Sequence, residues 1–113
     1  MSGVAGLFNV PSSAEELATW SGIHMTHHID IARVIYDVLK IALPVYQLDP
    51  FDPKDLGQWS DLHQEMHNQQ NAILGINGFN LLDPDFTDAG RLQGWIDFNA
   101  VEHREAADIL EIG

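Results

Sequence analysis

The chain has 113 residues, enough for one domain with a modest hydrophobic core. Seventeen acidic and five basic residues give it a formal net charge of −12. This charge argues against direct binding to nucleic acid or to an anionic membrane surface, because both depend on Lys and Arg. The absence of cysteine excludes disulfides, thiolate metal sites and thiol nucleophiles.

Residues 1–11 are small and mostly apolar, and we expect them to form an extended or mobile arm. They lack the basic region and apolar run that mark a secretory signal peptide. The longest apolar stretch, residues 29–45, is interrupted by charged residues and by Pro44. We therefore expect no segment that spans a bilayer.

The first predicted helix occupies about residues 12–44. Two adjacent serines, Ser12 and Ser13, are each followed three places later by a glutamate, which is the pattern of a helix capping box. Pro44 cannot continue a helix, so we expect this one to end at about Leu43. Its last part has no counterpart in the other predicted helices and would face another subunit or a partner.

Two further helices are predicted, over about residues 52–75 and 87–112. The first begins in an acidic connector that contains prolines and ends at Gly75. Thr87 or Asp88 would cap the second. The sequence thus predicts that residues 1–113 form a single all-α domain, folded as a three-helix bundle.

The same motif recurs in all three predicted helices, namely Trp-x3-His/Asn-x3-His with a leucine three residues before the tryptophan. These offsets place the repeated side chains on one side of a helix. Spacings of 39 and 36 residues between the tryptophans indicate three copies of one helical unit. We predict that these positions form the core: Leu17, Trp20, His28, Leu56, Trp59, His67, Leu92, Trp95 and His103.

Two interpretations of the histidines remain open. In the first, the rings are structural, covered by tryptophan and hydrogen-bonded to one another or to Asn99, with pH-dependent switching as a variant. A hydrogen-bond network tolerates Asn99 in place of a third histidine, whereas a metal shell would be damaged. This interpretation predicts no metal, no cofactor and a surface position for His27, which lies off the helix face.

The second interpretation is a metal site. Histidines four residues apart on one helix can chelate one ion, and two such pairs on facing helices can complete its shell. The spacing is similar to that of hemerythrin-like and other four-helix metal carriers, although only three helices are predicted and their Glu-x-x-His pattern is absent. The ligands would be His24, His28, His63, His67 and His103, with nearby carboxylates at Glu65, Glu102, Glu105 and Asp108.

The sequence contains no pattern that indicates an enzyme. Most acidic residues fall at predicted helix caps or on outer faces, and none forms a calcium-binding loop. A glycine-rich phosphate loop and a nucleophile elbow are also absent. We predict no catalytic and no cofactor-binding residues.

Several segments resemble small acidic helical proteins encoded among bacteriophage virion genes: residues 20–28 (WSGIHMTHH), 63–71 (HQEMHNQQN), 73–78 (ILGING) and 95–103 (WIDFNAVEH). The resemblance extends over most of residues 11–112. It implies a non-enzymatic structural or assembly protein of the head, neck or tail, present in several copies and in contact with other virion proteins. Such a protein would be made in the host cytoplasm and found in the particle. A weaker alternative is an acidic inhibitor of a basic host protein.

Overall fold

A computed structural model describes residues 3–45, 56–78, 81 and 84–112 of the chain. These residues form four α-helices and no strand: α1 (Gly3–Leu7), α2 (Ala14–Leu39), α3 (Leu56–Leu74) and α4 (Ala89–Leu110). This part of the chain is all-α, as predicted, but it has four helices where three were expected. None of these helices combines the length and the apolar character needed to cross a membrane.

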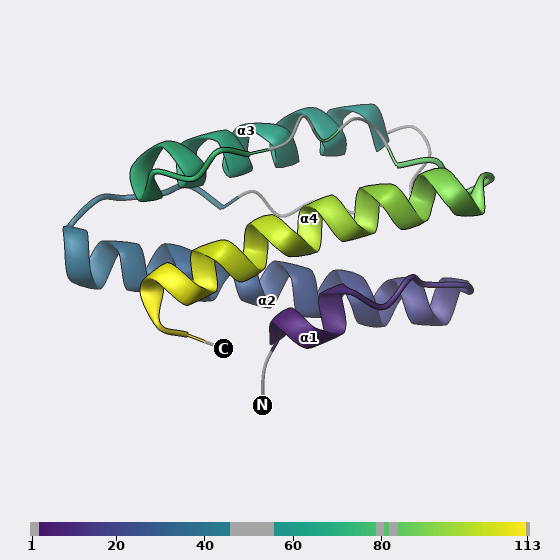
Figure 1. Cartoon of the computed structure of the whole chain (residues 1–113), viewed down its shortest axis with the longest axis horizontal. Helices are drawn as coiled ribbons and strands as arrows, with labels where there is room; N and C mark the ends of the chain where they lie inside the picture. Colours follow the sequence, from purple (N-terminus) through teal and green to yellow (C-terminus); the bar gives the residue numbers. More distant parts are fainter. Residues whose placement is uncertain (1–2, 46–55, 79–80, 82–83, 113) are drawn as a thin grey trace.

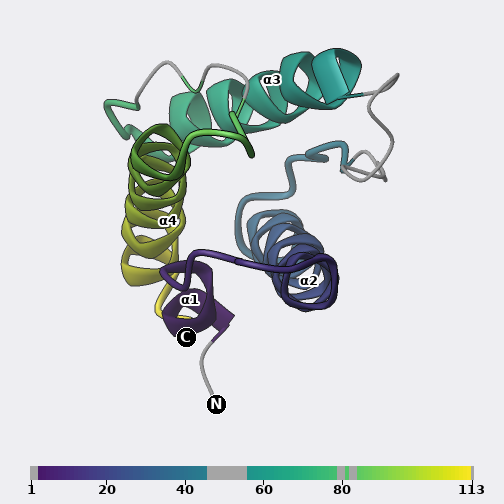
Figure 2. The same ribbon diagram turned by 90° about the vertical axis from the view of Figure 1, so that its right-hand side faces the viewer.

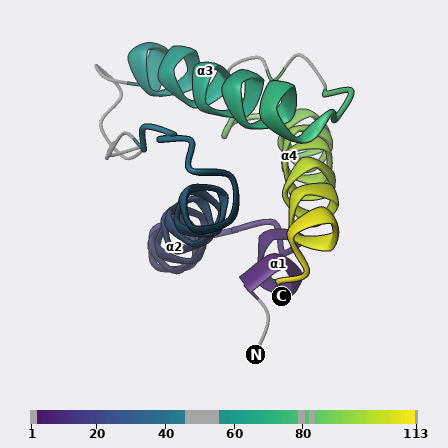
Figure 3. The same ribbon diagram turned by 90° about the vertical axis from the view of Figure 1, so that its left-hand side faces the viewer.

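The three long helices run in the same direction, from right to left in Figure 1. α4 packs against both α2 and α3, and the short α1 lies between α2 and α4 (Figures 2 and 3). No Cα atom of α2 lies within 8 Å of one in α3. Side chains in the interior must therefore connect these two helices.

The expectation of an extended or mobile arm at residues 1–11 is wrong for α1. Leu7 is completely buried, and its carbonyl oxygen accepts a 3.2 Å hydrogen bond from the indole N–H of Trp20. Gly6 packs so closely on α2 that a Cβ atom there would lie 3.0 Å from the Ile23 side chain. The small apolar residues of this segment allow a helical turn to approach α2 closely.

α2 begins as predicted and ends about one turn earlier than predicted. The Ser13 side chain accepts a hydrogen bond from the Glu16 amide, and the Glu16 carboxylate accepts one from the Ser12 amide. At the other end, Lys40 adopts the left-handed conformation with φ 58° and ends the helix after Leu39. Pro44 is therefore not the residue that stops α2.

The ends of α3 and α4 that the structure describes agree with the sequence. Gly75, with φ 72°, follows the last residue of α3. Asp88 is the N-cap of α4 and accepts a hydrogen bond from the Arg91 amide. The predicted start of the second helix, at residues 52–55, lies outside the described residues.

Two apolar clusters pack the long helices, one toward their amino ends and one toward their carboxyl ends. The first cluster, which we call the tryptophan cluster, contains Leu7, Trp20, Trp59, Leu92, Trp95, Ile96 and Ala100. The second, the aliphatic cluster, is centred on Ile31, Ile35 and Ala106. Because the helices are parallel, the histidines that follow the tryptophans in each helix lie between the two clusters.

Most of the predicted core is buried: Trp20, His28, Trp59, His67, Leu92, Trp95 and His103. Leu17 and Leu56 are only partly buried and pack at the edge of the tryptophan cluster. Both come from the first turns of their helices, where fewer neighbouring residues cover them.

Replacing Trp59 by alanine tests the placement of the tryptophan cluster. Trp59 is 4% exposed and packs against Trp95 with ring centroids 5.6 Å apart. Its loss should lower the free energy of unfolding by about 3–5 kcal/mol, the usual effect of removing a buried large side chain. Urea denaturation followed by circular dichroism measures this value. The control Val38→Ala, at a side chain that is 66% exposed, should change it by less than about 0.5 kcal/mol. Equal effects of the two variants would refute the placement.

Candidate metal centre

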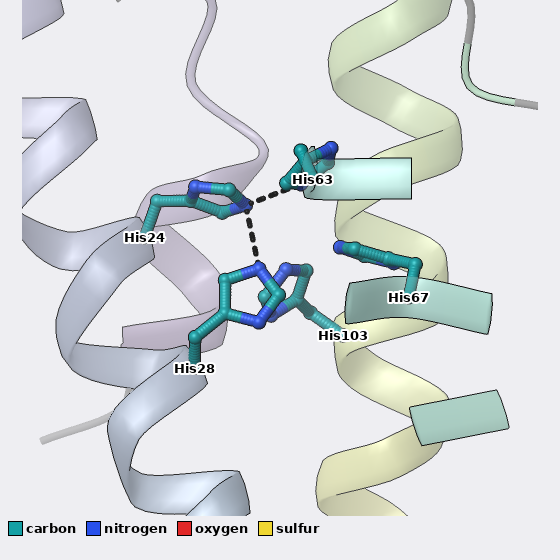
Figure 4. Close-up of side chains that lie close together, drawn as sticks. All are labelled: His24, His28, His63, His67 and His103. Carbon is teal, nitrogen blue, oxygen red and sulfur yellow. Dashed lines mark hydrogen bonds between the residues drawn. The ribbon is translucent and has the colours of Figure 1, made fainter. Parts of the chain in front are cut away.

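All six histidines of the chain are buried. Five of them each bring one ring nitrogen to a common region, where these atoms lie within 4.8 Å of one another (Figure 4). α2 and α3 each contribute two of these rings and α4 contributes one. We call this group the five-histidine cluster: His24, His28, His63, His67 and His103.

The separations within the cluster are those of ligands around one ion. The Nε2 atom of His24 lies 3.2 Å from Nε2 of His28 and 3.1 Å from Nε2 of His63. Nitrogens bound at about 2.1 Å are separated by about 3.0 Å at a right angle and by about 3.4 Å at a tetrahedral angle. The largest separation in the cluster is 4.8 Å, which slightly exceeds the distance of about 4.2 Å between ligands on opposite sides of one ion. A slight movement of the rings toward one another is therefore enough to bind the ion.

Hydrogen bonding among the side chains does not account for the position of His24 Nε2. An imidazole nitrogen carries either one hydrogen or one lone pair. His24 Nε2 nevertheless faces three polar atoms, which are Nε2 of His28, Nε2 of His63 and Oδ1 of Asn99 at 3.2 Å. A cation placed among these atoms would interact favourably with all of them, whereas a single hydrogen on His24 Nε2 would not.

The remaining two rings are held through their Nδ1 atoms. Nδ1 of His67 lies 3.3 Å from the Glu102 carboxylate, and Nδ1 of His103 lies 2.7 Å from Nδ1 of His27. The Nε2 atoms of His67 and His103 are buried and have no hydrogen-bond partner among the described residues. In metal sites, the second nitrogen of a ligating histidine is commonly held in this way. Nε2 is therefore the ligand atom that each ring can offer.

Glu102 supplies a buried negative charge beside the cluster. Its side chain is completely buried and, besides His67, accepts a hydrogen bond from the Asn71 amide. The backbone at Gly78 packs so close to this pair that a Cβ atom there would overlap both side chains. The other three carboxylates expected near the histidines are exposed: Glu65, Glu105 and Asp108.

The environment of the cluster keeps four of its five rings neutral. Burial, followed by repulsion from neighbouring imidazoles, lowers the pKa of four rings well below 6.5: His24, His28, His63 and His103. A histidine must be neutral to bind a metal ion. At pH 7 these rings are therefore in the protonation state that metal binding requires.

Tryptophans cover one side of two of the rings, as the four-residue spacing between tryptophan and histidine predicts. Trp20 stacks on His24 with ring centroids 4.6 Å apart, and Trp59 stacks on His63 at 4.8 Å. The Trp20 indole N–H does not donate to an imidazole, because the Leu7 carbonyl accepts its hydrogen bond. The indoles thus contribute apolar cover to the cluster.

The prediction that His27 lies at the surface is wrong. His27 is 4% exposed because α4 packs over that side of α2 and brings His103 against it. Gln70 and Asn71 were not predicted to be buried, but both are buried in α3 although they belong to a polar stretch. The one signal for their burial is their spacing of three and four residues from His67.

No protein-family model, curated protein or solved structure matches the chain. The resemblance to phage virion proteins stays a prediction from the sequence.

Acidification should destabilise the metal-free protein. The pKa values of the buried histidines are lower in the folded chain than the usual 6.5, so the unfolded chain binds more protons below about pH 6.5. Stability is fully present above this pH and is lost as the pH falls toward the lowered pKa values.

With a chelator present, the urea midpoint should fall as the pH is lowered from about 8 to about 5. The size of the fall should correspond to the uptake of at least about two protons per chain on unfolding. The net charge of −12 by itself favours the opposite trend, because acidification reduces repulsion among carboxylates. A midpoint that stays constant or rises would contradict the burial of neutral imidazoles.

Proposed function

We propose that the protein binds one divalent transition-metal ion in the five-histidine cluster. The observation that carries this proposal is the convergence of five buried ring nitrogens within 4.8 Å. Imidazole nitrogen suits zinc, copper, iron and nickel, whereas magnesium and calcium prefer oxygen ligands. This proposal replaces the purely structural role that the sequence favoured for the histidines.

The charge of the surroundings supports one ion and not two. Histidines bind a metal ion in their neutral form, and Glu102 is the single buried carboxylate among the described residues. One divalent ion would leave about one uncompensated positive charge, and two ions would leave about three, in a region from which water is excluded. Buried charge without a partner is strongly unfavourable.

The ion would add a link between helices that otherwise contact each other only through side chains. α2 and α3 do not approach each other along their backbones, and His24, His28 and His63 meet between them. Because the unfolded chain has no preformed site, the free energy of metal binding would add to the free energy of folding. We therefore assign the ion a structural role.

A metal-stabilised domain is compatible with the assembly role that the resemblance implies. We propose, as a second and separate step, that the domain is a structural part of a phage particle. Exposed apolar side chains gather at and just beyond the carboxyl end of α2 and would suit contact with another protein: Tyr36, Val38, Leu39 and Ile41.

Metal analysis of protein purified without a histidine tag tests the proposal. We expect about one transition-metal ion per chain by elemental mass spectrometry, with loss of most of it in each of three variants: His28→Ala, His67→Ala and His103→Ala. The control Asn68→Ala changes an exposed residue next to His67 and should retain the ion. A folded wild-type protein that contains no metal and takes none up would refute the metal-binding function.

The Glu102 carboxylate provides a second test. Glu102→Gln removes the charge that polarises the His67 ring and offsets that of the ion, so metal affinity should fall about 10–100-fold. Competition with a chromophoric chelator measures this affinity. Glu105→Gln, at an exposed carboxylate on the same helix, should leave it unchanged. Equal affinities of the two variants would show that Glu102 does not act on the ion.

A further inference from the structure

The repeated motif provides six equivalent positions, of which histidine occupies five. They lie four and eight residues after the three tryptophans and contribute one pair to each long helix: His24 and His28, His63 and His67, Asn99 and His103. The tryptophans precede these pairs and the residues of the aliphatic cluster follow them on all three helices. The pairs therefore lie at one level of the parallel helices, and six ligands complete an octahedral shell.

Asn99 is placed with the ligand atoms. It is completely buried, and its Oδ1 atom lies 3.2 Å from Nε2 of His24. That separation equals the distance from the same atom to His28 Nε2 and nearly equals the 3.1 Å to His63 Nε2.

The orientation of the amide supports the same role. The Nδ2 atom of Asn99 is buried and has no hydrogen-bond partner among the described residues. Leaving a buried donor unpaired costs free energy, and an ion bound to the oxygen would offset this cost. We infer that Oδ1 of Asn99 is the sixth ligand of the ion, in a shell of five imidazole nitrogens and one amide oxygen.

This inference rests on the proposed metal-binding function and has a clear competitor. In the competing arrangement, Asn99 only accepts a hydrogen bond from His24 and never contacts the ion. The two roles differ in coordination number, which is six with Asn99 as a ligand and five without it. Cobalt(II) reports this difference, because its visible d–d bands are weak in six-coordinate sites and become stronger as ligands are lost.

The main experiment titrates cobalt(II) into metal-free wild-type protein and into Asn99→Leu, which keeps a similar volume and removes the oxygen. Wild type should bind one ion with weak bands. Asn99→Leu should bind with stronger bands and with an affinity lowered by at least about 10-fold, the smallest loss typical of disturbing a metal site. Gln70→Leu is the matched control, because Gln70 is also a completely buried amide, and neither its Oε1 nor its Nε2 atom has a hydrogen-bond partner among the described residues. This control should match wild type in bands and affinity.

Two further variants keep the test decisive where Asn99→Leu does not fold. Asn99→Asp supplies an anionic oxygen and should bind cobalt(II) at least about 10-fold more tightly, with bands as weak as those of wild type. Asn99→His completes six imidazoles and should also remain six-coordinate. Stronger bands in Asn99→Asp, or no gain in its affinity, would overturn the inference.

The outcomes separate this inference from the proposed function. Unchanged bands and affinity in Asn99→Leu, with one ion bound by wild type, would remove Asn99 from the shell and leave the five-histidine site intact. Wild-type protein that binds no cobalt(II) and contains no other metal would overturn both proposals.

Discussion

Imidazole nitrogens that converge between the three long helices are the central interaction of this molecule. Buried polar groups are stable only when they have partners, and these rings lie between two apolar clusters where water is largely excluded. Glu102 contacts Nδ1 of His67, and His27 contacts Nδ1 of His103. Nε2 of His24 lies close to polar atoms from all three helices. α2 and α3 contact each other through side chains, in this layer and in the two apolar clusters, because their backbones do not meet.

The parallel arrangement explains why a repeated sequence can produce a single convergent layer. In antiparallel helices, a residue that follows the tryptophan would lie above it in one helix and below it in the next. Here all three helices point the same way, so the tryptophans share one level and the histidines share the next (Figure 1). Each pair needs only the four-residue spacing of a helix to present both rings to the same interior.

The sequence predicted those features of the fold that depend on local chemistry. The Ser13 and Asp88 caps, the end of α3 at Gly75 and the burial of the tryptophans follow from side chains close to each site. Features that depend on packing between distant segments were not predictable in this way. Leu7 is buried only because α2 and α4 leave room for α1, and His27 only because α4 covers a second side of α2. The convergence of the rings likewise depends on the common direction of the helices, which the spacing does not encode.

Asn99 shows why the same residue can support opposite conclusions before and after the helices are placed. As a break in a histidine pattern, it argues against a metal shell. In the folded chain its oxygen is as close to His24 Nε2 as a neighbouring imidazole is, and its amide nitrogen has no partner among the described residues. An octahedral ion accepts oxygen as readily as nitrogen at one position, so the substitution alters the donor set without removing a donor. A small domain with this many polar groups at its centre gains most from an ion that pairs with all of them at once.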